Sequence, residues 1–454
     1  MPAPACLPAR IPANPRAVAA LAIVSSLTAG AVTQANAVPL FARQTGQTCA
    51  ACHNGFPELT PYGRLFKLNG YTFGGGQSNI PPISAMAVAS FTNTQANQPG
   101  GAAPHYGENN NPAIDFISLF YGGVILPNLG MFGQITYDNI GKALTWDNTD
   151  IRYARAFNIG GHETIFGVSV NNNPTVSDVW NSTPAWGYPW LASGLAPTPA
   201  AATLIEGGLA QQVVGVDPYV FWNRLVYAEF GAYRTLGNKL LYELGANPGP
   251  PSPINGVATY WRVAIEPKWG PNSWEFGTFG MRAATVPGDV SGFGTDHITD
   301  VGIDTQYQYL ADVNSFSVQA DLIAESDRFD ASQALGNASN KNDHLRSFHV
   351  KASYYYDQTY GGTLGWFRIN GSGDAALYGA SSASNSPDSS GFIGELDYLP
   401  FNHGGPAWWP WLNVKFGVQY TYYTRLNGGT NNYDGVGDNA SGANTLYLFA
   451  WLAF

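Results

Sequence analysis

The sequence is poor in cysteine, in charged residues and in long apolar runs, and each shortage excludes a class of protein. Three cysteines occur among 454 residues, and charged residues make up 11%. A net charge of −10 argues against nucleic acid and anionic membrane surfaces as partners. Beyond residue 37, no apolar run reaches the roughly 18 residues that a transmembrane helix needs. No nucleophilic triad, phosphate-binding loop or acid/base carboxylate pair stands out.

Residues 1–37 have the pattern of a secretory signal peptide. Arg10 and Arg16 lie in the first part of this stretch, an apolar run follows, and the small-x-small cleavage signature Ala35-Asn36-Ala37 ends it. Removal of this leader takes away both arginines and moves the net charge from −10 to −12. It also takes away Cys6, so the exported chain keeps only Cys49 and Cys52.

The two remaining cysteines stand in the motif Cys49-Ala50-Ala51-Cys52-His53. Two thiols two residues apart, followed at once by an imidazole, form the attachment pattern of a c-type haem: the thiols add to the vinyl groups and His53 becomes the proximal iron ligand. A redox-active Cys-x-x-Cys would favour a thioredoxin-like βαβ setting, and zinc would require four ligands. Neither feature is present in the sequence. Export agrees with haem attachment, which takes place outside the cytoplasm.

The haem motif lies in a short basic stretch, residues 38–82, which we call the N-terminal segment. A segment of roughly 45 residues rarely buries enough apolar surface to fold alone, so we expect the rest of the chain to cover the haem. Arg43, Arg64 and Lys67 are candidate partners of the haem propionates. A solvated basic face is the alternative interpretation of each.

Residues 83–454 show the pattern of a transmembrane β-barrel. Segments about ten residues long alternate apolar and polar residues and are separated by Gly, Pro, Asn and Asp. In the clearest segment, Leu412, Val414 and Phe416 alternate with Asn413, Lys415 and Gly417. The sequence predicts sixteen strands: 83–95, 113–124, 129–140, 147–158, 163–172, 211–222, 224–235, 257–267, 272–285, 296–309, 314–326, 345–357, 361–371, 391–400, 411–424 and 443–454.

Alternation alone does not say which face contacts lipid, because a soluble sandwich shows the same pattern. The last segment decides for the membrane, since it ends on Phe454 and resembles the C-terminal assembly signal of bacterial outer-membrane barrels. An even strand number and alternating short and long connections agree. With a periplasmic N-terminus, the long connections are expected on the outer side: 96–112, 173–210, 236–256, 286–295, 327–344, 372–390 and 425–442.

A sixteen-stranded barrel is wide enough for an open lumen. The N-terminal segment needs walls, so we expect it to plug the periplasmic half of that lumen and to place its haem in a low-dielectric setting. The predicted fold is therefore all-β, a sixteen-stranded outer-membrane barrel plugged by a short c-type haem segment. A soluble periplasmic cytochrome would leave Phe454 and the lipid-like faces unexplained.

Met86 is the candidate for the second axial ligand of the haem iron. It lies at the start of the first strand with the parity of Ser84, Ser90 and Thr92, so it should face the lumen near His53. Simple packing against the N-terminal segment is the alternative. The remaining histidines are less well placed: His105, His162, His297, His344, His349 and His403.

The stretch FARQTGQTCAACH, followed by FPELTPYGRLFKLNGYTF and PPISAMAVASFTNTQ, resembles the outer-membrane fused monohaem cytochrome-porin family of extracellular iron(II) oxidases. The resemblance covers the mature chain, and the haem motif and first strand are its specific part. It implies one covalent haem c, bound by Cys49 and Cys52 with His53 as axial ligand. It also implies iron(II):cytochrome oxidoreductase activity, with electrons passing from iron(II) outside to a periplasmic c-type cytochrome.

Carboxylates on the lumen side would attract iron(II) as hard oxygen ligands. Ordinary polar lining of a porin lumen is the alternative interpretation. Two other functions remain open: a diffusion porin with a structural haem plug, and an electron conduit for another donor, such as a reduced sulfur species, a humic compound or an electrode. The carboxylates with lumen parity are Asp115, Asp138, Asp150, Glu229, Asp304 and Asp321.

Overall fold

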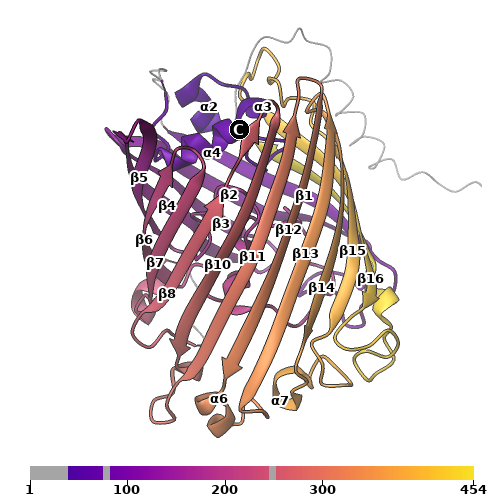
Figure 1. Ribbon diagram of the computed structural model, residues 1–454. Helices are drawn as coiled ribbons and strands as arrows, with labels where there is room; N and C mark the ends of the chain where they lie inside the picture. The colour runs from indigo at the N-terminus through magenta and orange to yellow at the C-terminus, as the bar shows by residue number, and fades with distance from the viewer. Residues whose placement is uncertain (1–38, 75–81, 245–251) are drawn as a thin grey trace, which may run out of the picture.

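The computed structural model describes residues 39–74, 82–244 and 252–454. The expected signal peptide, residues 1–37, lies outside these ranges, as does part of the N-terminal segment. What is described of that segment consists of three short helices, α2 (Pro39–Thr45), α3 (Cys49–Cys52) and α4 (Pro61–Leu68). Strands form almost everything after it (Figure 1).

All sixteen predicted strands are present, and their bounds differ from the prediction by a few residues at most. The largest differences, at the start of β4 and the start of β13, lie at strand ends, where turn composition rather than side-chain alternation sets the boundary. The strands are β1 (Ile83–Thr94), β2 (Asn111–Leu126), β3 (Leu129–Asp138), β4 (Ala143–Ile159), β5 (His162–Asn171), β6 (Val213–Trp222), β7 (Val226–Thr235), β8 (Ala258–Ile265), β9 (Lys268–Trp269), β10 (Asn272–Thr285), β11 (Asp296–Leu310), β12 (Asn314–Arg328), β13 (Asn342–Tyr356), β14 (Tyr360–Gly371), β15 (Ser389–Tyr398), β16 (Asn413–Arg425) and β17 (Thr445–Ala453).

The sheet closes on itself. Each strand pairs antiparallel with its neighbour in sequence, and β1 pairs with both β2 and β17. The two-residue β9 continues β8 beyond Glu266 and Pro267, and both pair with β10. Proline lacks the N–H that a ladder requires, which accounts for the interruption. The barrel therefore has sixteen strands that cross it, and it is closed.

Side chains along each strand alternate between the lumen and the outer surface, as expected for a barrel in lipid. In β16, Gln419 and Tyr423 are buried inside, whereas Val418, Tyr420 and Tyr422 are exposed outside. Exposed large apolar residues of the same kind occur on most other strands. Among the described residues, no helix is long and apolar enough to cross a membrane.

The two ends of the barrel differ in the length of their connections. Most connections are short turns at the end that holds the N-terminal segment and the C-terminus, and most are longer loops at the opposite end (Figure 1). The exceptions are the long connection between β15 and β16 at the first end and the short one between β3 and β4 at the second. Short turns mark the periplasmic end of such barrels. The long connections carry most of the remaining short helices: α5 (Asn238–Glu243), α6 (Asp330–Leu335), α7 (Ala375–Tyr378), and the single turns Pro184–Trp186, Leu204–Gly208, Pro287–Asp289 and Ala440–Ala443.

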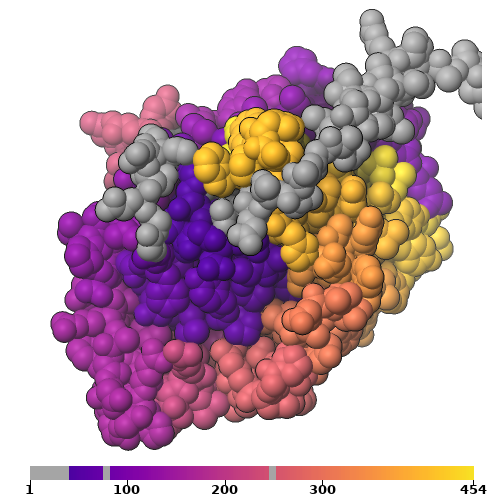
Figure 2. Space-filling view, turned by 90° about the horizontal axis from the view of Figure 1, so that it is seen from above, coloured from indigo at the N-terminus to yellow at the C-terminus, as the bar shows by residue number. Residues whose placement is uncertain are grey.

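The N-terminal segment lies inside the short-turn end of the barrel. Figure 2, viewed onto this end, shows it filling the opening that the strands frame. Most side chains of α3 and α4 are buried. The segment also bonds to the barrel wall, since Arg64 donates to Gln308 and Tyr71 donates to Asp150. The barrel wall therefore supplies the core that so short a segment lacks.

One long connection does not stay outside the barrel, contrary to the expectation for residues 173–210. Residues 172–212, which we call the lumen loop, begin and end at the outer end but fold into the lumen, where Val176, Val179 and Trp180 are buried. Its backbone touches the N-terminal segment, because Lys67 Nζ donates to the carbonyl oxygens of Val176 and Asp178 at 2.7 Å. The lumen is thus occupied from both ends.

Candidate functional site

The Cys-x-x-Cys-His motif is held by two helices packed at close range. Cys49 and Cys52 open and close the single turn of α3, and Thr60 caps α4 by accepting a hydrogen bond from Gly63 N. A Cβ at position 63 would lie 2.3 Å from the carbonyl oxygen of Cys52. Glycine at this position therefore allows α4 to lie directly against the motif.

His53 is oriented as an iron ligand requires. Its Nδ1 lies 2.8 Å from the carbonyl oxygen of Pro57. A hydrogen bond from Nδ1–H to this carbonyl fixes the tautomer and leaves Nε2 with its lone pair. Burial lowers the pKa of His53 to about 4, so the imidazole is neutral at physiological pH. A neutral, oriented imidazole is the form that binds iron.

Both thiols of the motif are buried, with 3% of Cys49 and 7% of Cys52 exposed. Burial raises the pKa of each thiol to about 12. Redox-active Cys-x-x-Cys pairs have the opposite property, a thiolate stabilised by a lowered pKa. The surroundings therefore argue against thiol–disulfide chemistry at this motif.

A cavity of about 380 Å³ adjoins the motif, which is within the roughly 300–1,000 Å³ of small-molecule and cofactor sites. Cys52, His53 and Met86 line it, whereas Cys49 packs against Ala42 one helical turn behind Cys52. Its remaining walls are mainly apolar, with many aromatic side chains and a few polar residues. The aromatic residues are Phe41, Phe56, Phe66, Tyr71, Phe116, Phe120, Phe132, Trp186, Trp190 and Trp451.

These walls suit an apolar macrocycle with polar substituents. The Trp451 Nε1–H is buried without a hydrogen-bond acceptor, so the cavity wall contains a donor that still needs a partner. Met86 faces the lumen, as its parity predicts, and shares the cavity with His53. None of the six histidines considered as alternative ligands lines this cavity.

The three basic residues considered as propionate partners lie in different settings. Lys67 lines the cavity, with its ammonium 4.8 Å from the centre of the Trp186 ring. Burial, and then the neighbouring Arg152, lowers the pKa of Lys67 to about 7. Arg43 is not among the residues that line the cavity; it donates to the carbonyl oxygen of Ile83 and faces the Trp411 ring.

Arg64 points away from the cavity and into the barrel wall. Its guanidinium donates to Glu266 Oε1 at 2.5 Å and to Gln308 Oε1 at 2.7 Å. Glu58 forms a second ion pair between the segment and the wall, in which the segment carries the negative charge: Lys351 Nζ of the wall lies 2.7 Å from Glu58 Oε2. These buried ion pairs fix the N-terminal segment to the wall, which is a structural role for Arg64.

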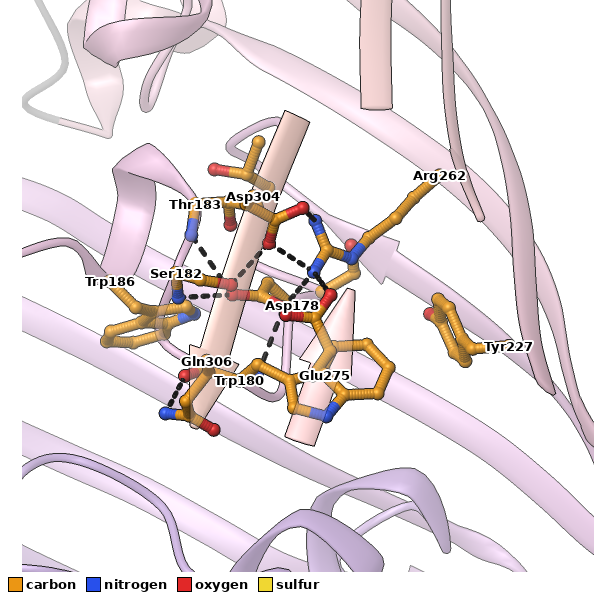
Figure 3. Close-up of polar contacts among 12 residues, drawn as sticks. Asp178, Trp180, Ser182, Thr183, Trp186, Tyr227, Arg262, Glu275, Asp304 and Gln306 are labelled. Atoms are coloured by element: carbon orange, nitrogen blue, oxygen red, sulfur yellow. Dashed lines mark hydrogen bonds and ion pairs between the residues drawn. The ribbon is translucent and has the colours of Figure 1, made fainter. Parts of the chain in front are cut away.

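A second buried ion cluster fixes the lumen loop. Figure 3 shows the Arg262 guanidinium among three carboxylates, at 2.7 Å from Asp304, 3.1 Å from Glu275 and 3.5 Å from Asp178 of the loop. The indole of Trp180 lies beneath the same guanidinium, with its ring centre 5.1 Å away. Asp178 also accepts hydrogen bonds from three backbone amides of the loop.

Most carboxylates considered for attracting iron(II) are engaged in structural contacts. Asp150 pairs with Arg152 at 2.7 Å and accepts from Tyr71 Oη at 2.6 Å. Asp138 accepts from the backbone of its own turn. Asp304 belongs to the Arg262 cluster, while Asp115 and Glu229 accept from tyrosine hydroxyl groups. Asp321 differs from the other five in lining a cavity beside His349.

No three His, Cys, Asp or Glu side chains of residues 39–74, 82–244 and 252–454 converge as a ready-made metal cage. Several residues that shape the site were not identified from the sequence: Glu58, Trp451, Glu206 and His349 in its role beside Asp321. Charged residues with lumen parity, such as Lys351 and Arg262, were the available signal. A basic side chain that faces the lumen predicts that a carboxylate of a loop or of the N-terminal segment pairs with it.

Comparisons with known proteins find only distant similarity, to outer-membrane barrels among the solved structures. No protein-family model and no curated protein matches the sequence. The outer-membrane channel DcaP of Acinetobacter baumannii is 12% identical, with a TM-score of 0.45 over 84% of this chain and 99% of that one. OmpF of Salmonella typhi in complex with daunomycin is 12% identical, with a TM-score of 0.44 over 82% and 97%.

An anion-selective porin from Comamonas acidovorans gives 11% identity and a TM-score of 0.42 over 82% of this chain and 98% of that one. Likenesses at this level concern barrel shape alone, and we infer no activity from them. A closed sixteen-stranded barrel with an apolar outer surface satisfies every backbone group within lipid. The protein is a porin-like barrel of a bacterial outer membrane.

Proposed function

We propose that the protein is an outer-membrane electron-transfer barrel that carries one covalent haem c. The observation that carries this proposal is the aromatic cavity in which Cys52, His53 and Met86 meet. The cavity lies toward the short-turn end of the barrel, where a periplasmic c-type cytochrome could receive the electron. When bound, the haem supplies a one-electron redox centre.

The residues around the cavity have distinct roles in this proposal. Cys49 and Cys52 would hold the haem covalently, and His53 Nε2 would bind its iron, with the Pro57 carbonyl holding the ring in place. Met86 would supply a further iron ligand. The aromatic walls exclude water, and the Trp451 indole N–H is a free donor for a polar substituent.

Iron(II) is the donor that we propose. The test is to oxidise the protein, purified from outer membranes, and to follow its haem absorption bands while iron(II) is added without oxygen. We expect rapid reduction of the haem. Reduction by dithionite but not by iron(II) would leave an electron conduit for another donor, and the absence of covalent haem would contradict the whole proposal.

Met86 can be tested as a ligand with a matched control. Replacing Met86 with leucine removes the thioether but keeps the volume nearly unchanged, so the reduction potential should fall because methionine ligation raises it. Met281 is a buried methionine of another cluster, and Met281→Leu should leave the potential unchanged. Equal potentials in both variants would show that Met86 only packs against the haem.

A diffusion porin with a structural haem plug is the second candidate. The sixteen-stranded barrel favours it, because barrels of this size hold aqueous channels. The N-terminal segment and the lumen loop argue against it, because both are fixed in the lumen by buried ion pairs. Steady ion conductance of the haem-loaded protein in planar bilayers would favour the porin.

A further inference from the structure

A second cavity of about 380 Å³ lies beside the haem cavity inside the barrel. The lumen loop separates the two, and Ala185 and Gly187 line both of them. The second cavity is bounded on its other side by Asp321, midway along β12, and His349 of β13. The backbone between Pro184 and Tyr188 is thus the partition between the two cavities.

The polar groups of this second cavity are unlike those around the haem. Glu206 of the lumen loop and Asp321 of the wall face His349, whose Nδ1 lies 3.8 Å from one carboxylate and 3.3 Å from the other. The side chains of both carboxylates are partly exposed to the cavity, at 13% and 15%. Among the described residues, His349 is the one hydrogen-bond and ion-pair partner of Asp321.

A buried oxygen without a partner lies beside Asp321 and His349. Gln319 is only 4% exposed, and among the described residues its Oε1 has no hydrogen-bond donor. The residue lines a small adjoining pocket together with Asp321 and His349. A buried amide oxygen without a donor is costly unless an unseen water or cation satisfies it. Amide and carboxylate oxygens are the ligands that hard divalent cations prefer.

Toward the outer end of the barrel, the same wall carries carboxylates that no basic side chain neutralises. Asp300 faces Glu325 across β11 and β12, and Asp327 faces Asp343 across β12 and β13. All four are buried on the lumen side, and no ion pair joins any of them to a described Lys, Arg or His. Lumen faces with charge of one sign concentrate counter-ions and guide them inward.

We propose that the cavity lined by Glu206, Asp321 and His349 is a binding site for a hydrated divalent cation, which these residues hold through its water ligands because they do not converge as direct ligands. The unpaired carboxylates farther out guide the cation from the outer mouth to this site. This cavity shares the Ala185 and Gly187 wall with the haem cavity. A reducing cation bound there would therefore lie next to the haem and donate one electron to it. This last step rests on the proposed function, whereas the binding of a cation does not.

The test uses the full haem-loaded protein in detergent and Mn(II) as a probe that the haem does not oxidise. Bound Mn(II) is measured as loss of the sharp electron paramagnetic resonance signal of the free ion. We expect saturable binding that Asp321→Asn weakens about tenfold or more, because ligand charge sets the affinity of such sites. Asp312→Asn, in an exposed turn at the short-turn end, is the matched control and should not change the affinity.

Absence of saturable Mn(II) binding to the wild-type protein would overturn the proposal, as would equal affinity in wild type and Asp321→Asn. Glu206→Gln provides a second test if Asp321→Asn does not assemble. Haem absorption and its reduction by dithionite are recorded for every sample. Loss of haem with Mn(II) binding intact would contradict the proposed function alone, and the reverse result would contradict only the cation site.

Discussion

Buried carboxylates have different partners in the two halves of the lumen. In the half that holds the N-terminal segment and the inner part of the lumen loop, several buried carboxylates pair with buried Arg or Lys, as Glu58 does with Lys351 and Asp304 with Arg262. In the outer half of β11, β12 and β13, Asp300, Glu325 and Asp327 form no ion pair with a basic side chain of the described residues. Asp300 and Glu325 accept instead from the lumen-loop amides of Ile205 and Leu204, so no described cation balances these carboxylates.

The largest expected effect is the loss of the covalent haem that we propose in the half of the lumen that holds the N-terminal segment. The double substitution Cys49→Ser and Cys52→Ser should abolish covalent haem completely, because no other cysteine remains after the leader. The barrel should still assemble, since strand pairing and the buried ion pairs do not involve the thiols. Haem staining of denaturing gels measures the first outcome, and the gel mobility of unheated samples measures the second. Covalent haem in the double variant would refute the attachment site.

Breaking the Arg262 cluster should produce the next largest effect. Arg262→Met leaves Asp178, Glu275 and Asp304 buried without a cation, and we expect a loss of about 3–5 kcal/mol in the free energy of unfolding. Urea unfolding in lipid vesicles gives this quantity. The control is Arg224→Met, because Arg224 pairs with Glu163 at 2.6 Å but with 54% and 45% of the side chains exposed. There we expect about 0–1 kcal/mol.

The pairing of Glu58 with Lys351 predicts an acid-sensitive N-terminal segment. Burial alone would raise the pKa of Glu58, but the Lys351 ammonium and the hydrogen bonds from Gln308 and Asn54 outweigh burial and hold this pKa below its usual value. The stabilisation is therefore complete above the unfolded value of about 4.3 and is lost as pH falls through the lower folded value.

Protease cleavage within residues 39–74 of barrels in detergent measures this release as a function of pH. Glu58→Gln should expose the segment already at neutral pH, at a cost of about 1–3 kcal/mol. If the Glu58→Gln variant shows the same acid transition as the wild-type protein, the transition belongs to another titratable group.

The smallest effect on stability is expected in the unpaired half. Asp327→Asn with Asp343→Asn removes two like charges that face each other, so the free energy of unfolding should change by less than about 1 kcal/mol or should rise. Reduction of the haem by iron(II) should nevertheless slow at low ionic strength and approach the wild-type rate at high salt. A large loss of stability instead would show that these carboxylates hold structure, as those of the paired half do.

The sequence predicts the barrel well because each strand repeats one simple rule. Side chains alternate between lipid and lumen with period two, so β10 (Asn272–Thr285) was predicted with its observed bounds and even β6 was found. The lumen-facing position of Met86 follows from the same rule. The haem motif is equally local, because five consecutive residues carry the whole pattern.

The sequence does not predict the partners of charged residues, because they come from distant strands. Asp150, Asp304 and Asp321 share lumen parity, yet Arg152 and Arg262 neutralise the first two and leave Asp321 beside His349. Arg64 similarly pairs with Glu266, which is 202 residues away. The inward fold of the lumen loop was missed for a related reason, since its Ala-, Pro- and Gly-rich composition is that of an ordinary surface loop.

The seam between β1 and β17 imposes an order on biogenesis. It joins the first strand to the last, so the wall is incomplete until the final residues of the chain have paired with Met86 to Thr94. Once the wall is complete, Cys49 and Cys52 are almost inaccessible inside it. Any group joined to these thiols must therefore be attached while the N-terminal segment is still outside a closed barrel. The insertion machinery of the membrane would then receive a chain that already carries its cofactor.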